Sequence, residues 1–127
     1  MAQPTVAGKP WEEFLAERPL GVIATTGAEG MPHAVPVEVI VKDGRAYVWC
    51  KASSRKARNA ARDGRAALVA YKMNDGVLLR GRVRLIVEGE PGYDSITKMF
   101  LTKYERDETY GNDTLIEVTP HRVTTFS

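Results

Sequence analysis

Short apolar runs separated by turn residues recur along the chain and predict an antiparallel β protein. Connections between the runs are mostly too short for parallel crossovers, so neighbouring strands are expected to run antiparallel. Strands this numerous in a small chain close into a barrel, which removes their exposed edges. We therefore predict a mainly β fold in one domain, residues 1–127. The expected strands cover 20–26, 32–41, 45–50, 66–72, 77–87, 114–118 and 121–126.

Three segments show helical spacing of apolar residues instead. The middle helix has good boundary signals, because Ser53 or Ser54 can cap its start and Gly64 can end it. We expect these helices to lie on the periphery of the barrel. The helical segments are 9–19, 54–63 and 94–107, and a loop is expected at 108–113.

Composition excludes several classes of protein. The chain has 18 basic and 16 acidic residues, a balance that does not indicate a nucleic-acid-binding protein. Cys50 is the single cysteine, so an intrachain disulfide is excluded and a reducing compartment is expected. Neither a signal-peptide core nor an apolar run of membrane-spanning length is present. We expect a soluble, cytoplasmic protein without a membrane partner.

The segment KASSRKARNAARDG, residues 51–64, places Arg55 and Lys56 in the first turn of the middle helix. Cations are disfavoured there because a helix N-terminus is already partly positive. A bound phosphate would reverse the sign of this interaction, and the hydroxyls of Ser53 and Ser54 would add donors. The sequence therefore indicates a phosphate site, although a solvated basic helix explains the same pattern.

A second basic feature is the run VLLRGRVRLIV, in which Arg80, Arg82 and Arg84 share one strand face. Pairing with acids on neighbouring strands would explain this row. Alternatively, Arg80 reaches the same anion as Lys56.

The remaining residues give weaker indications of a functional site. Pro36 interrupts a strand and indicates an edge, a bulge or a flat ligand beside the backbone. Basic neighbours would lower the pKa of Cys50, but a single cysteine also commonly serves in packing. The spacing of Cys, His and carboxylate residues predicts no metal site. Since no catalytic triad or Gly-rich nucleotide motif is present, any reaction would depend on a cofactor.

The order of three motifs resembles a known family. G-x-P-H-x-x-P-V is followed by S-R-K-A-R-N-x-x-R-D-x-R and then R-G-R-V. This order resembles the pyridoxamine-phosphate-oxidase-like split β-barrel proteins, and within them the short branch that binds flavins or the deazaflavin coenzyme F-420. The resemblance covers about residues 10–89 and returns in LIEVTPHRV.

The resemblance implies a six-stranded antiparallel split barrel that forms a homodimer with a cofactor at each end of the interface. It implies a cofactor phosphate at Ser54, Arg55 and Lys56, and a ring system along the backbone of the earlier strand that contains Val35 and Pro36. The residues implied beside the ring are Val35, Pro36, Val37, Glu38, Trp49 and Cys50, with Arg80 as a further contact.

Departures from the family refine the expected function. The arginine- and histidine-bearing substrate motif of pyridoxamine-phosphate oxidases is missing, so activity on that substrate is not expected. Val35 stands where FMN oxidases often carry an arginine, and the run KARNAARD favours F-420 as the cofactor, with FMN a close second.

We expect an oxidoreductase that transfers a hydride between its cofactor and a small organic substrate, with no catalytic side chain identified. A non-catalytic flavin- or tetrapyrrole-binding carrier or sensor is the alternative. A nucleic-acid partner is not expected, because aromatic residues are not interleaved with the cations.

Overall fold

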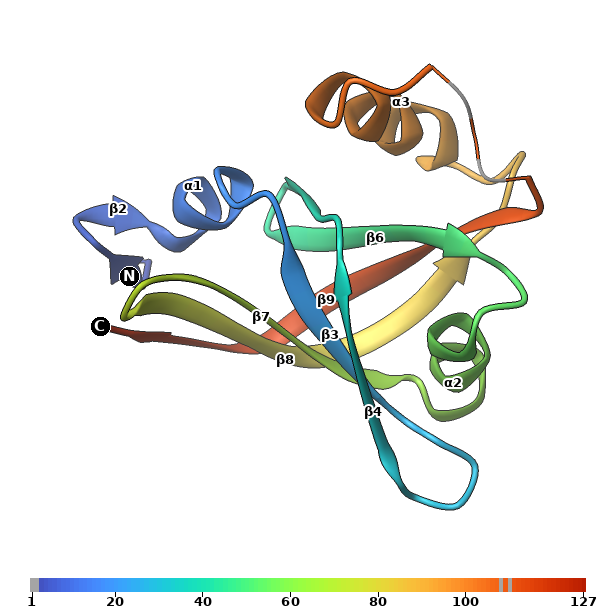
Figure 1. Ribbon diagram of the computed structural model, residues 1–127, viewed down its shortest axis with the longest axis horizontal. Coiled ribbons are helices and arrows are strands. Elements are labelled where there is room, and N and C mark those ends of the chain that lie inside the picture. The colour runs from blue at the N-terminus through green and yellow to red at the C-terminus, as the bar shows by residue number, and fades with distance from the viewer. Residues whose placement is uncertain (1–2, 108, 110) are drawn as a thin grey trace.

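The computed structural model describes residues 3–107, 109 and 111–127. A seven-stranded antiparallel sheet with the order β4-β3-β7-β8-β9-β6-β5 curls into a half-closed barrel (Figure 1). The predicted mainly β class and split-barrel architecture are therefore confirmed. The strands are β3 (Gly21–Thr26), β4 (Pro32–Val37), β5 (Ile40–Lys42), β6 (Arg45–Lys51), β7 (Arg65–Lys72), β8 (Asp75–Ile86) and β9 (Asp113–Phe126).

The split in the barrel lies between β4 and β5. These strands form the two edges of the sheet, yet only residues 38 and 39 join them. Because so short a link spans roughly 7–10 Å, the two edges must approach one another. The single strand predicted over 32–41 is therefore wrong at this point, and the sheet has seven strands rather than six. Conversely, the two strands predicted at 114–118 and 121–126 form a single strand, β9. Its pairing with β8 shifts in register between Arg80 and Gly81.

Helix α2 (Arg55–Asp63) forms where the sequence predicts it. Ser54 is its N-cap, and Gly64 ends it with a φ of 79°. Helix α1 (Trp11–Ala16) is shorter than expected, because residues 9 and 10 belong to a two-stranded sheet of β1 (Thr5–Val6) and β2 (Lys9–Pro10). Strands of two residues are too short to leave a periodic signal.

Helix α3 (Tyr93–Lys103) ends four residues before the predicted boundary at 107. The predicted loop at 108–113 includes residues 108 and 110, which lie outside the described residues, and β9 begins at its last position.

The two faces of the sheet are covered differently. Inward side chains such as Ile23 and Leu68, which are paired across β3 and β7, fill the barrel. On the outer face, α3 covers the half that contains β5 and β6, where Trp49 and Phe100 are buried together. The outer face of β4, β3 and β7 lies away from α3, as Figure 1 shows. This difference leaves half of the outer face available to another molecule.

Candidate functional site

A cleft of about 400 Å³ lies at the split in the barrel, between the edge of β4, the end of β6 and the start of α2. It brings together most of the residues that the resemblance placed beside a cofactor: Pro36, Val37, Glu38, Trp49, Cys50, Ser54 and Lys56. Sequence reasoning did not include Leu20 and Lys51, which also line the cleft together with Ser53. Leu20 is 53% exposed and directly precedes β3, but an exposed leucine alone is not a signal of function.

One end of the cleft is cationic because of the way α2 begins. The Ser54 hydroxyl oxygen accepts a hydrogen bond from the Ala57 N–H at 3.3 Å. The N–H groups of Arg55 and Lys56, earlier in the same turn, have no helical carbonyl to donate to. The first turn holds no acidic residue, and the Lys56 side chain lines the cleft. This end can therefore bind an anion through backbone donors, a hydroxyl and an ammonium group.

The opposite wall of the cleft is largely apolar. Pro36 lies on β4, which is an edge strand, and it is paired with Val22 of β3. This placement agrees with the edge position predicted for a proline inside a strand. The neighbouring Leu20 and the aromatic ring of Trp49 extend the apolar wall. Such a surface favours a flat ring system.

Glu38, at the rim of the cleft, is paired with a residue that sequence analysis did not identify. A guanidinium nitrogen of Arg106 lies 3.2 Å from a carboxylate oxygen of Glu38, and the same guanidinium lies 5.2 Å from the centre of the Trp49 ring. Arg106 follows α3 and is therefore distant in sequence from both partners. It connects two residues of the cleft wall and balances the charge of Glu38.

Cys50 lines the cleft but does not have the properties of a nucleophile. Its side chain is buried, and burial raises the pKa of the thiol although Ser54 and Lys56 act in the opposite direction. The expected lowering of this pKa by basic neighbours is therefore wrong, because desolvation of the thiolate is the larger effect. Cys50 contributes packing to the wall of the cleft.

Three predicted residues lie elsewhere in the single chain. Val35 points inward and packs against the barrel core, so only its backbone could contact a ligand at the edge. Arg55 lines a separate hollow between α2 and the β3–β4 hairpin, together with His33 and Arg58. Arg80 is exposed on the outer face of β8. Their participation in cofactor binding stays a prediction.

The arginine row on β8 is partly explained by pairing. Arg84 donates to Glu117 on β9 at 2.8 Å, as the solvent-face interpretation expects. Glu117 is buried and also accepts a hydrogen bond from the hydroxyl of Tyr47 at 3.1 Å. Arg80 and Arg82 are not part of this cluster.

Within residues 3–107, 109 and 111–127, no cluster of three or more His, Cys, Asp or Glu side chains could hold a metal ion. In the same part of the chain, no helix is long and apolar enough to cross a bilayer.

A curled antiparallel sheet whose two edges meet at a split places the protein in the class of split β-barrel proteins. The family comparison agrees: residues 8–127 match the profile of pyridoxamine 5′-phosphate oxidase, and the chain belongs to this family. No curated protein matches the chain.

Solved structures share this fold at low sequence identity. The conserved hypothetical protein Rv2991 from Mycobacterium tuberculosis is 21% identical with a TM-score of 0.73, covering 100% of this chain and 90% of that one. An F-420 reductase is 20% identical with a TM-score of 0.70 over 88% and 94% of the two chains. The haem storage protein HutZ from Vibrio cholerae is 13% identical with a TM-score of 0.74 over 90% of each chain. At these identities the likeness establishes the fold and not the activity.

Proposed function

We propose that the protein is a flavin- or deazaflavin-dependent oxidoreductase, with F-420 favoured over FMN, that transfers a hydride between its cofactor and a small organic substrate. The observation that carries this proposal is the composition of the cleft. A cationic helix start at one end and an apolar wall at the other match a planar ring system joined to a phosphate.

The chain's own groups then have separate roles. Lys56, the Ser54 hydroxyl and the first N–H groups of α2 bind the phosphate. The segment from Pro36 to Glu38, at the end of β4, would orient the ring and shield it from water. A ring bound there would supply the hydride chemistry, while these residues hold and orient it. Cys50 is not used as an acid or nucleophile, because its thiol is buried.

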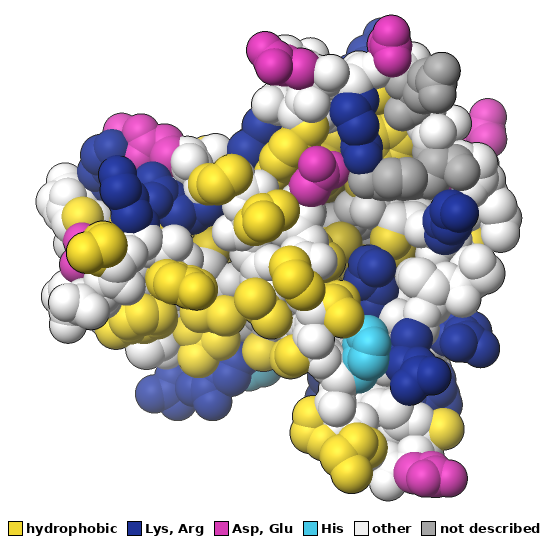
Figure 2. All heavy atoms as spheres, in the orientation of Figure 1, with side chains coloured by type: hydrophobic (Ala, Val, Ile, Leu, Met, Phe, Trp, Pro, Cys, Tyr) yellow, Lys and Arg dark blue, Asp and Glu magenta, His cyan; other side chains and the backbone are white. Residues whose placement is uncertain are grey.

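We also propose that the protein forms a homodimer through the uncovered outer face. Pro36, Val22, Val69 and Leu78 are directly paired across β4, β3, β7 and β8, and they point outward as a continuous apolar row. Apolar side chains extend over these strands on the face that Figure 2 shows. The cleft borders this face at Pro36, so a partner seated there would lie beside the cofactor.

Titration of the purified protein with FMN and with F-420, followed by fluorescence, tests the proposal. We expect micromolar or tighter binding of at least one cofactor, and failure to bind either would overturn it. Turnover of the reduced complex with enones, quinones or biliverdin separates an enzyme from a carrier or sensor.

A further inference from the structure

A groove of about 410 Å³ lies between α1, β5 and α3, and we refer to it as the α1–α3 groove. It shares no lining residue with the cleft at the split in the barrel. Its volume falls within the range of roughly 300–1,000 Å³ that small-molecule sites occupy. The groove is therefore a separate place where a small molecule could bind.

Most of the lining of the α1–α3 groove is apolar. Ile40 and Val41 of β5 contribute to it from one side and Met99 of α3 from another. Ile40 is buried, and the half-buried Met99 packs against the same cluster of side chains. Because methionine adapts its shape to different neighbours, this lining can close around apolar groups of several shapes.

Lys103 brings a half-buried cation to this apolar lining. Its ammonium group has three donors, and among the described residues it donates to the Val39 carbonyl at 2.8 Å. The ammonium also lies 5.2 Å from the centre of the Tyr104 ring. No ion pair between described residues includes Lys103. Its remaining donors are therefore left for water or for a bound molecule.

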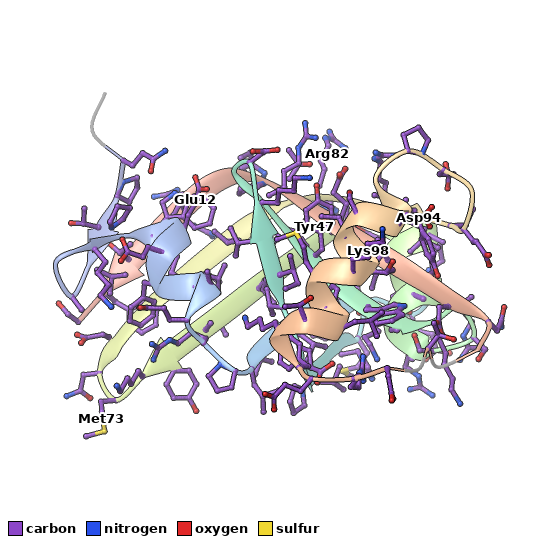
Figure 3. The ribbon with its side chains drawn as sticks, turned by 90° about the horizontal axis from the view of Figure 1, so that it is seen from above. Glu12, Tyr47, Met73, Arg82, Asp94 and Lys98 are labelled. Atoms are coloured by element: carbon purple, nitrogen blue, oxygen red, sulfur yellow. The ribbon has the colours of Figure 1, made fainter. Side chains whose placement is uncertain are left out.

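The charges around Lys103 favour an anion. Burial lowers the pKa of Lys103 to about 8 and Arg18 acts in the same direction, whereas Glu38 opposes them. Glu38 is already paired with Arg106 at 3.2 Å, and no ion pair of the described chain includes Arg18. Lys98, which is exposed on α3 (Figure 3), adds another cation to the groove. A bound anion would supply the counter-charge that these groups lack.

We propose that the α1–α3 groove binds a small hydrophobic monocarboxylate. The apolar body of this ligand packs on β5 and Met99, and its carboxylate accepts hydrogen bonds from Lys103. A phosphate group fits less well, because its oxygens take several strong donors at once and the groove offers one half-buried ammonium. A neutral apolar ligand would leave that ammonium partly desolvated without a counter-charge. This site goes beyond the proposed function, since it uses none of the residues of the cleft.

Titration with 4-phenylbutyrate near neutral pH, followed by NMR of the backbone amides, provides the first test. We expect saturable binding, with the largest shifts at Val41 and Met99. Two ligands serve as controls: 4-phenylbutanamide has the same apolar body without the charge, and acetate has the charge without the body. Each should bind at least about tenfold more weakly. Absence of saturable binding, equal binding of the amide, or shifts centred on Cys50 and Lys56 in the cleft would overturn the proposal.

Lys103→Met tests the proposed partner of the carboxylate. We expect it to weaken 4-phenylbutyrate binding by about tenfold or more, the scale of a charged hydrogen bond. Lys42→Met is the matched control, because Lys42 is exposed on β5 and does not line the groove. It should change the affinity less than about threefold. Equal affinities of wild type and Lys103→Met would overturn the assignment.

A second variant keeps Lys103 and obstructs the groove instead. Thr102 is exposed and lines the groove, so Thr102→Phe adds bulk there without altering the core, and we expect it to abolish binding of 4-phenylbutyrate. Ser95→Phe, at an exposed position of α3 outside the groove, should bind like the wild type. Undiminished binding by Thr102→Phe would overturn the location. If the protein binds neither FMN nor F-420, the proposed function fails, and these titrations still decide the groove.

Discussion

The hydroxyl of Tyr104 fixes Val39 at the split in the barrel: the Tyr104 oxygen accepts a hydrogen bond from the Val39 N–H at 2.9 Å. The same hydroxyl lies 2.9 Å from the carbonyl oxygen of Pro19, to which it can donate. Lys103 donates to the Val39 carbonyl at 2.8 Å. Val39 lies between β4 and β5, outside both ladders, and is 1% exposed. Residues at the end of α3 therefore replace the strand partner that this segment lacks, next to the rim of the cleft.

Removal of this hydroxyl tests its importance for stability. Tyr104→Phe leaves the buried Val39 N–H without its acceptor, and we expect the free energy of unfolding to fall by about 1–3 kcal/mol. Urea denaturation provides the measurement. Tyr71→Phe is the control, since Tyr71 is 61% exposed and should tolerate the change. Equal losses in the two variants would contradict a specific role for Tyr104.

Lys103 should make stability depend on pH in the alkaline range. Burial lowers the pKa of Lys103 to about 8 from its ordinary value of 10.5, and nearby Arg18 acts in the same direction. Between these two pH values the unfolded chain binds more protons than the folded one, so the contribution of Lys103 to stability rises with pH.

Comparison with Lys103→Met isolates this contribution. The difference in the free energy of unfolding, wild type minus variant, should become more favourable to the wild type as the pH increases from 8 to about 10. Lys98→Met, a lysine substitution on the exposed face of the same helix (Figure 3), serves as the control. A difference for Lys103→Met that does not change with pH would show that its amine is not desolvated in the folded protein.

Lys56→Ala tests the phosphate end of the cleft. We expect cofactor binding to weaken by about 1.5–3 kcal/mol, because a charged hydrogen bond to the phosphate is lost. Arg58→Ala is the control: Arg58 lies on the same helix but lines the neighbouring hollow. Isothermal titration with the preferred cofactor measures both variants, and an unchanged dissociation constant for Lys56→Ala would exclude the phosphate assignment.

Alkylation of Cys50 should be slow in the native protein. The thiol is 4% exposed, and burial raises its pKa, so little accessible thiolate is present near pH 7. Mass spectrometry after incubation with iodoacetamide should show fast labelling only when urea unfolds the chain. Labelling of the native protein at the rate of a free cysteine would mean that the β6 end opens frequently.

Local structure was predictable from the sequence where residues close together in the chain determine it. Ser54 and Gly64 mark the boundaries of α2, and the positions of Arg55 and Lys56 in its first turn follow directly from them. Strand alternation likewise gave the class of fold, because side chains on successive residues point to opposite faces. Pro36 indicated an edge, a bulge or a ligand beside the backbone, since proline cannot donate to a sheet ladder, and the structure places it on an edge strand.

Tertiary structure decided what adjacent residues cannot specify. The break at residues 38 and 39 depends on two sheet edges meeting, and the apolar continuity from 32 to 41 conceals it. Burial reversed the expected shift in the pKa of Cys50, and two strands, β3 and β7, separate Arg80 on β8 from the β4 edge of the cleft. The pairing of Arg106 with Glu38 joins segments far apart in the chain. Sequence by itself determined the local elements and the cationic helix start, whereas their relative positions depend on contacts between distant segments, which only the folded chain forms.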